Sequence, residues 1–262
     1  MDVLKNDLQN YLDIANQIAD KAKEISMAYF RNDFSVSIKD DFTPVTLIDQ
    51  KIESFARKLI QSKFPDCGII GEEEANFQVG SDDIWVIDPI DGTKAFVSGI
   101  PVFTTMIGVL RNGIPVLSVV DNPVMDERWI GIENEPSRLN GINLSTSSET
   151  DLTKSSLHAT SPQMFSKDEY LRWMELAKNV AFHHYGSESY SYCLLAGGYL
   201  ELVVEADLKI CDFLPVIKLI QGSGGVITDW EGKSLSVESD GHVIASSSRI
   251  LHDQAVRFLQ AT

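Results

Sequence analysis

Two aspartates stand three positions apart in residues 84–97, which read IWVIDPIDGTKAFV. The apolar run at residues 84–87 has the length and the β-branched content of a buried strand, and we expect it to stop at Asp88. Pro89 removes a backbone donor and favours extended geometry at the residue before it. We therefore expect the chain to turn here and to bring Asp91 back towards Asp88, so that two carboxylates converge.

Gly92 and Thr93 follow these aspartates and could begin a short helix at residues 94–96. A glycine lets the backbone approach a ligand closely, and free amides at a helix start favour an anion. Carboxylates beside such amides would suit Mg²⁺ bridged to a phosphate, because this ion takes hard oxygen ligands and substrate phosphate oxygens. Taken singly, however, Asp-Pro and Asp-Gly are more often ordinary turn signals.

Further acidic residues lie near expected strand and helix ends. Residues 71–74 read GEEE directly after the apolar run at residues 67–70. Such a run is most often a solvated loop, but its place just before the Asp88 strand makes it a plausible source of ligands. Asp212 precedes an expected helix in an apolar neighbourhood, where the common interpretation is an N-cap.

These motifs resemble the signature of the inositol monophosphatase family of Mg²⁺-dependent, lithium-sensitive phosphatases. The likeness rests on DPIDGT with the upstream GEE and covers nearly the whole chain. Four segments are more similar to the histidinol-phosphate phosphatase branch than to the inositol branch: residues 85–101, 121–131, 159–165 and 205–214.

The resemblance implies two to three Mg²⁺ ions per active site. It implies oxygen ligands for two of them: Glu72, Asp88 and the carbonyl of Ile90 for one ion, and Asp88, Asp91 and Asp212 for the other. Glu73 would help a third ion through water, and Glu72 would also take part in catalysis. Two such ions, roughly 3.5–4 Å apart, can bind opposite sides of an in-line displacement without a covalent intermediate. The family pattern around Asp212 is W-D-x-A, from which this chain departs while keeping the aspartate.

The resemblance also implies catalytic roles for Asp49 and Thr93, which would hydrogen-bond to each other and together orient and deprotonate a metal-bound water. Without it, Thr46 and Asp49 are more simply interpreted as part of a capping box. The amides of Gly92 and Thr93 would bind phosphate oxygens. Lys39 would assist near the metal site.

Substrate choice is expected to depend on two glutamates in the second half. Glu205 lies seven positions before Asp212, where inositol phosphatases carry a glutamate that binds substrate hydroxyls. Glu188 lies where those enzymes tend to carry a small residue. Two carboxylates facing the leaving group would favour a cationic substrate such as L-histidinol phosphate, which carries an amine and an imidazole. Alternatively, Glu188 is only a surface helix residue.

The expected activity is hydrolysis of a small phosphorylated metabolite, with L-histidinol phosphate as the substrate and a role in histidine biosynthesis. The enzymatic alternatives are a myo-inositol-1-phosphatase and a broader sugar-phosphate or nucleotide phosphatase. A relative without catalysis, acting as a binding or scaffold protein, would show the loss of a ligand carboxylate. All four of these carboxylates are present: Glu72, Asp88, Asp91 and Asp212.

Composition limits the possible partners. With 22 basic and 38 acidic residues the net charge is −16, which disfavours nucleic acid. The 262 residues contain no apolar run of membrane-spanning length, and residues 1–5 lack the apolar core of a signal peptide. Three scattered cysteines indicate a reducing compartment, so we expect a cytoplasmic protein. A homodimer is expected from the family resemblance.

Periodicity predicts the elements that must position these residues. We expect helices at residues 7–30, 45–63, 166–178, 188–195, 214–221 and 253–259. We expect strands at residues 35–39, 67–70, 84–87, 128–132, 156–160, 200–204 and 226–228, and a hairpin turning at Asn112-Gly113. The fold class is α+β, and the resemblance implies a layered αβαβα sandwich of the sugar-phosphatase type. Residues 1–262 should form one domain, with an α+β half at about 1–145 and an α/β half at about 150–262.

Overall fold

The computed structural model describes residues 2–32, 36–38 and 44–260. The α-helices of these residues are α1 (Asp2–Tyr29), α2 (Leu47–Lys63), α3 (Thr93–Val97), α4 (Lys167–Ala177), α5 (Tyr190–Ala196), α6 (Ile210–Phe213), α7 (Ile217–Gly222) and α8 (Arg249–Gln260). Among them, none combines the length and the apolar character that crossing a membrane requires.

The larger sheet has seven strands in the order β3-β4-β5-β6-β7-β8-β9, of which β3 and β4 are parallel and the other pairs antiparallel. Its strands are β3 (Gly68–Gly71), β4 (Asp83–Asp91), β5 (Thr104–Arg111), β6 (Ile114–Asn122), β7 (Glu127–Ile132), β8 (Arg138–Leu139) and β9 (Ile142–Asn143). A separate pair consists of β1 (Val36–Ile38) and β2 (Pro44–Thr46).

The second sheet has the order β11-β10-β12-β14-β13 and mixes parallel with antiparallel pairs. Its strands are β10 (Ser156–Ala159), β11 (Phe182–Tyr185), β12 (Leu202–Glu205), β13 (Val226–Thr228) and β14 (Val243–Ser246).

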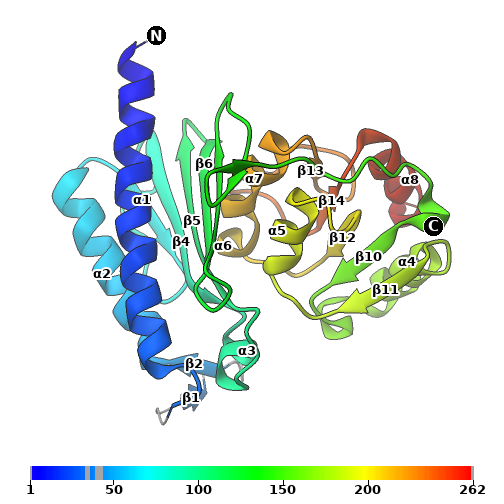
Figure 1. Ribbon diagram of the computed structural model, residues 1–262, viewed down its shortest axis with the longest axis horizontal. Coiled ribbons are helices and arrows are strands. Elements are labelled where there is room, and N and C mark those ends of the chain that lie inside the picture. The colour runs from blue at the N-terminus through cyan, green and yellow to red at the C-terminus, as the bar shows by residue number, and fades with distance from the viewer. Residues whose placement is uncertain (1, 33–35, 39–43, 261–262) are drawn as a thin grey trace.

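Helices and sheets alternate in five layers across the molecule (Figure 1). Helices α1 and α2 cover one face of the larger sheet, and α5, α6 and α7 lie between the two sheets. Helices α4 and α8 cover the outer face of the second sheet. The expected αβαβα arrangement is confirmed.

Each interface between layers is filled by buried apolar side chains. Trp85 and Ile18 belong to the cluster between α1, α2 and the larger sheet, and both are fully buried. Phe213 belongs to the central cluster, and Trp173 to the cluster beneath α4 and α8. Burial of a large apolar side chain contributes roughly 1.5–3 kcal/mol, so these interfaces hold the layers together.

Several local predictions are confirmed. The hairpin between β5 and β6 turns at Asn112 and Gly113, whose φ angles of 52° and 76° match the twist of the strands. Helix α4 begins with the predicted capping box, in which the Ser166 hydroxyl accepts from the amide of Glu169 and the Glu169 carboxylate accepts from the amide of Ser166.

Several predicted element boundaries are wrong, and three of these differences have a local cause. The helix expected from residue 45 begins at Leu47, because residues 44–46 pair with β1. The helix expected at residues 188–195 begins at Tyr190, because Ser187 and Glu188 have positive φ angles. The helix expected at residues 214–221 is preceded by α6 and opens with a 3₁₀ turn that contains Pro215.

Gly131 of β7 allows the larger sheet to touch the backbone of α7. A Cβ atom on Gly131 would lie 2.3 Å from the amide nitrogen of Leu219 and 2.4 Å from the carbonyl carbon of Lys218. Backbone cannot yield as a flexible side chain can, so any larger residue must push α7 away from the sheet.

We therefore expect Gly131→Ala to lower the free energy of unfolding by about 3 kcal/mol in urea titrations. Gly80→Ala is the matched control, because a Cβ atom there meets no heavy atom within 4 Å. That variant should stay within about 1 kcal/mol of the parent protein. Equal stability of the two variants would contradict the close contact between β7 and α7.

Candidate metal centre and substrate pocket

A cavity of about 190 Å³ lies where the end of β4 faces α6 and the start of α5. Among the described residues, its lining holds two lysines, Lys94 and Lys209, and six carboxylates: Glu72, Asp88, Asp91, Glu188, Glu205 and Asp212. Acidic side chains therefore outnumber basic ones three to one in a partly enclosed space. Such a surface favours cations strongly.

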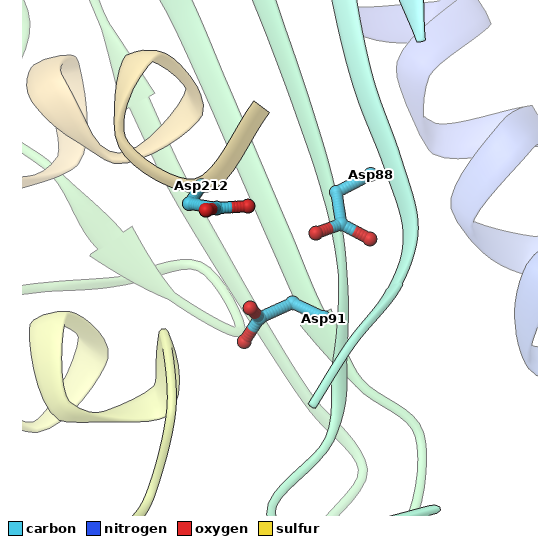
Figure 2. Close-up of side chains that lie close together, drawn as sticks. All are labelled: Asp88, Asp91 and Asp212. Atoms are coloured by element: carbon cyan, nitrogen blue, oxygen red, sulfur yellow. The ribbon is translucent and has the colours of Figure 1, made fainter. Parts of the chain in front are cut away.

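Asp88, Asp91 and Asp212 point towards one another (Figure 2). Each offers a carboxylate oxygen, and the three oxygens lie within 4.8 Å of one another. Asp88 and Asp91 come from β4, whereas Asp212 comes from α6 in the second half of the chain. The sequence-based expectation that the two β4 carboxylates converge is confirmed.

The way in which they converge differs from the expected turn, because β4 continues to Asp91 instead of stopping at Asp88. Asp88 pairs with Met106 of β5, and Asp91 pairs with Thr104, so β4 has one residue more than β5 over this stretch. That extra residue makes a β-bulge. In a regular strand, residues three apart point to opposite faces, and the bulge is what lets both aspartates face the cavity.

Burial and like charge act together on these carboxyl groups. Asp88 is 2% exposed, and its pKa is raised first by burial and then by the charges of Glu72, Asp91 and Asp212. The pKa of Asp91 is raised by burial and by the neighbouring Asp212 and Glu188. The amide of Ser189 opposes this shift by donating to Asp91 Oδ2 at 2.8 Å. A bound cation would relieve the repulsion.

Asp212 is not the N-cap of its helix, contrary to the common interpretation of its position. The N-cap residue is Lys209, and its backbone amide donates to Asp212 Oδ2 at 2.7 Å. Burial nevertheless raises the pKa of Asp212 to about 7, with a smaller contribution from the charge of Glu72. One carboxylate oxygen of Asp212 thus accepts from the backbone at the start of α6, and the residue also lines the cavity.

Glu72 and Glu73 differ in what they contact. Glu72 lines the cavity, and Lys209 Nζ donates to its Oε1 at 3.1 Å. The amide of Glu73 donates to Glu53 Oε2 at 2.7 Å. Glu74 is exposed, so only the last glutamate of the run fits the interpretation as a solvated loop.

The residues expected to orient water lie around the bulge. Asp49 is fully buried in α2, and its charge contributes to the raised pKa of Asp88. The hydroxyl of Thr93 donates to the carbonyl of Ile90 at 3.1 Å. The expected hydrogen bond between Asp49 and Thr93 stays a prediction, and Lys39 lies outside the described residues.

Gly92 joins β4 to α3 with a φ angle of 80°, which favours glycine. A Cβ atom on Gly92 would also lie 2.8 Å from Glu188 Cγ, so the loop and Glu188 are in close contact. Glu188 is therefore not a surface helix residue. It precedes α5 in a left-handed conformation, with a φ angle of 47°, and lines the cavity.

Glu205 forms the floor of the cavity at the end of β12. It is 2% exposed and accepts hydrogen bonds from Thr160 N and from Tyr192 Oη, both at 2.7 Å. Burial raises its pKa, and these two donors oppose the shift. Burial also raises the pKa of Glu188, and so does the charge of Glu205, while a hydrogen bond from the Thr160 side chain and the charge of Lys94 lower it.

Sequence reasoning missed six residues of the lining: Lys94, Thr160, Ser189, Tyr192, Leu208 and Lys209. Lys94 directly follows the DGT motif and Lys209 precedes Asp212 by three positions, so proximity to the motifs could have indicated both. Thr160 and Tyr192 carry no local signal, because only the tertiary fold brings them to Glu205.

We expect the burial and mutual repulsion of these carboxyl groups to lower the free energy of unfolding measurably in protein treated with a chelator. The pKa of Asp212 is about 7 in the fold against an ordinary value of 3.8. A raised folded pKa means that the carboxyl group stabilises the fold below about pH 4 and that this contribution is lost as pH rises through about 7. Asp212→Asn should therefore raise the free energy of unfolding at pH 8 by on the order of 2 kcal/mol.

Urea titrations with EDTA at pH 5 and pH 8 measure this effect. The gain from Asp212→Asn should be larger at pH 8 than at pH 5, because the parent carboxyl group is ionised only at the higher pH. A variant less stable than the parent at pH 8 would show that repulsion is not the dominant effect.

Comparison with known proteins shows what the chain is similar to. Residues 7–261 match the model of a family described as the inositol monophosphatase family. A solved structure of an inositol monophosphatase from Zymomonas mobilis superposes with a TM-score of 0.89 at 32% identity, over 97% of this chain and 98% of that one.

Relatives with more specific names are also similar over most of their length. The bifunctional phosphatase IMPL2, chloroplastic, of Arabidopsis thaliana is 38% identical over 97% of this chain and 76% of its own. A histidinol-phosphatase of Mycobacterium tuberculosis is 30% identical over 95% of this chain and 97% of its own. Inositol monophosphatase 1 of Xenopus laevis is 30% identical over 94% of this chain and 91% of its own.

Proposed function

The chain belongs to the inositol monophosphatase family and is a phosphoric monoester hydrolase, and we propose that its substrate is L-histidinol phosphate. The products would be L-histidinol and phosphate. The family is metal-dependent, generally with Mg²⁺, and acts on small phosphorylated substrates. The observation that carries the choice of substrate is a pair of glutamates that line the cavity, the partly buried Glu188 and the buried Glu205.

The donor set fits Mg²⁺. Three carboxylate oxygens lie within 4.8 Å of one another, and their raised pKa values reflect burial and mutual repulsion that a cation would offset. Hard oxygen ligands are those that Mg²⁺ prefers. We assign the ligands as Glu72, Asp88, the Ile90 carbonyl, Asp91 and Asp212, with two ions in the site. Glu73 as a contributor to a third ion stays a prediction.

When bound, Mg²⁺ lowers the pKa of a water and stabilises charge on the phosphoryl oxygens and the leaving oxygen. The protein's own groups do the rest. Asp49 and Thr93 together would orient the attacking water and take up its proton. The amides of Gly92 and Thr93 bind phosphate oxygens where negative charge develops. Lys39 as an auxiliary group stays a prediction.

Glu188 and Glu205 would bind the cationic part of the substrate. Glu188 Oε2 is buried, and no hydrogen-bond donor from the described residues reaches it. A buried carboxylate oxygen without a donor is costly, and an amine or imidazolium of the substrate would satisfy it. Glu205 is held in place by Thr160 and Tyr192, so its position does not have to be fixed by the substrate.

The second candidate substrate is myo-inositol-1-phosphate. Glu205 supports it, because a fixed carboxylate can accept hydrogen bonds from sugar hydroxyls as well as from an amine. A fully neutral leaving group would bring no positive charge to Glu188 and Glu205, which is why we place this candidate second. A role without catalysis is disfavoured by the presence of all expected ligand carboxylates.

The proposal includes three wider features. Both halves contribute to one apolar cluster, with Val86 of β4 and Val203 of β12 among its members, which supports a single domain. The three cysteines are buried free thiols, which supports a reducing compartment such as the cytoplasm. Homodimer formation, lithium sensitivity and a role in histidine biosynthesis stay predictions.

The metal assignment predicts the behaviour of Asp91→Asn. The variant should fold, because an amide oxygen can still accept from the amide of Ser189, but turnover with Mg²⁺ should fall by at least a hundredfold. The rise in melting temperature on adding Mg²⁺ should shrink as well, since that rise reports binding to the native state. Parent-like turnover would show that Asp91 is not a ligand.

The substrate assignment is tested with Glu188→Gln, which keeps the size of the side chain and removes its charge. For L-histidinol phosphate, kcat/KM should fall by ten- to a hundredfold, about 1.5–3 kcal/mol for a hydrogen bond to a charged group. For myo-inositol-1-phosphate it should stay within about threefold of the parent enzyme. The parent enzyme should itself prefer L-histidinol phosphate; a preference for the inositol ester would leave the metal chemistry intact and overturn this substrate assignment.

A further inference from the structure

Glu53 is a fully buried carboxylate that does not line the cavity. It lies on the face of α2 that packs against the loop after β3, and its four contacts are all with donors. Arg57 Nε and Nη2 both lie 2.7 Å from Oε1, the amide of Glu74 lies 3.0 Å from the same oxygen, and the amide of Glu73 lies 2.7 Å from Oε2. Three of these donors share Oε1 and one reaches Oε2, so both oxygens of the buried carboxylate are hydrogen-bonded or ion-paired.

Arg57 extends the contact to the same loop. Its Nη2 donates to the carbonyl of Glu74 at 2.9 Å, and its Nε lies 3.7 Å from the Glu74 carboxylate. Gly71 packs directly on the pair, because a Cβ atom there would lie 2.0 Å from Glu53 Oε1 and 2.6 Å from Arg57 Nη2. The backbone on both sides of Glu72 is thus held by one buried ion pair.

Glu72 needs such support more than the other acidic residues of the cavity do. Asp88 and Asp91 belong to a strand that is paired with β5 on both sides of the bulge, and Asp212 belongs to a helix, so backbone pairing within these elements positions them. Glu72 lies just after the end of β3, in a loop closed by the paired backbones of Ile69 and Phe77. Within this loop, the successive backbone amides of Glu73 and Glu74 both donate to the carboxylate of Glu53.

We propose that Glu53, held by Arg57, is a positioning residue that sets the place of Glu72 in the metal site, an inference that rests on the proposed function. A buried ion pair costs desolvation and is often replaceable by apolar residues without loss of stability. Stability alone therefore does not explain this pair. Its oxygens accept from the loop amides next to Glu72, a candidate metal ligand. Loss of a residue that holds a metal ligand in place typically lowers metal affinity ten- to a hundredfold.

The test is a Mg²⁺ titration of the melting temperature, which needs neither substrate nor turnover. Glu53→Gln replaces one acceptor oxygen with an NH₂ group. This group donates, so it cannot accept from the loop amide or from Arg57, and at least one of these contacts is lost. We expect the Mg²⁺ concentration at half-maximal stabilisation to rise at least tenfold. Asp83→Asn is the matched control: Asp83 pairs with Arg111 at the opposite end of β4, and the midpoint should stay within twofold of the parent protein.

A double-mutant cycle separates positioning from a general structural effect. Glu72→Gln alone should raise the midpoint, and adding Glu53→Gln to it should change the midpoint by less than twofold, because Glu53 acts through Glu72. If Glu53→Gln is too unstable to measure, the double replacement Glu53→Met with Arg57→Leu removes both charges and fills the same buried space with apolar side chains. It should show the same weakened response of the melting temperature to Mg²⁺.

Two results would overturn the inference. The first is a parent-like Mg²⁺ midpoint in Glu53→Gln or in the apolar double replacement, which would make the pair purely structural. The second is full additivity of Glu53→Gln with Glu72→Gln, which would mean that Glu53 acts by another route. A parent protein whose melting temperature does not respond to Mg²⁺ at all would instead reject the metal site of the proposed function, and the positioning role with it.

Discussion

Asp88, Asp91 and Asp212 repel one another in a buried space, and each has a pKa above that of a free aspartate. This repulsion is the constraint that the surrounding structure must satisfy. The protein offsets part of it with backbone donors, since the amide of Ser189 serves Asp91 and the amide of Lys209 serves Asp212. Under the proposed function, cations from solution offset the rest. A site that is poorly neutralised by its own chain is well suited to bind divalent metal and a phosphate together.

The layered fold allows this concentration of charge because it brings the acidic residues from separate elements. The larger sheet contributes the β4 bulge, the central helices contribute Asp212, and the second sheet contributes Glu205. Each element is anchored by apolar layers on both of its sides, so repulsion at the cavity does not separate the halves. The close packing of Gly131 against α7 shows how little space lies between the larger sheet and the central helices.

Local patterns predicted much of this structure. The Asn112-Gly113 hairpin, the Ser166 capping box and the αβαβα order follow from short-range signals or from the family resemblance. The β4 bulge could not be predicted, because Asp-Pro signals a turn and only the pairing with β5 extends the strand to Asp91. Glu188 lies against Gly92, which stands almost a hundred positions earlier, so no local pattern could predict this contact. Glu53 looks like one more polar residue of an amphipathic helix until the loop after β3 is placed against it.

Anomalous diffraction from crystals soaked in Mn²⁺, which takes the same kind of oxygen ligands as Mg²⁺, tests the account most directly. The account predicts a peak between the carboxylates of Asp88, Asp91 and Asp212, and a second peak where Glu72 and the carbonyl of Ile90 meet Asp88. Peaks only at other surface carboxylates, with the cavity empty at saturating Mn²⁺, would contradict the central claim that the buried acidic cluster is a metal site.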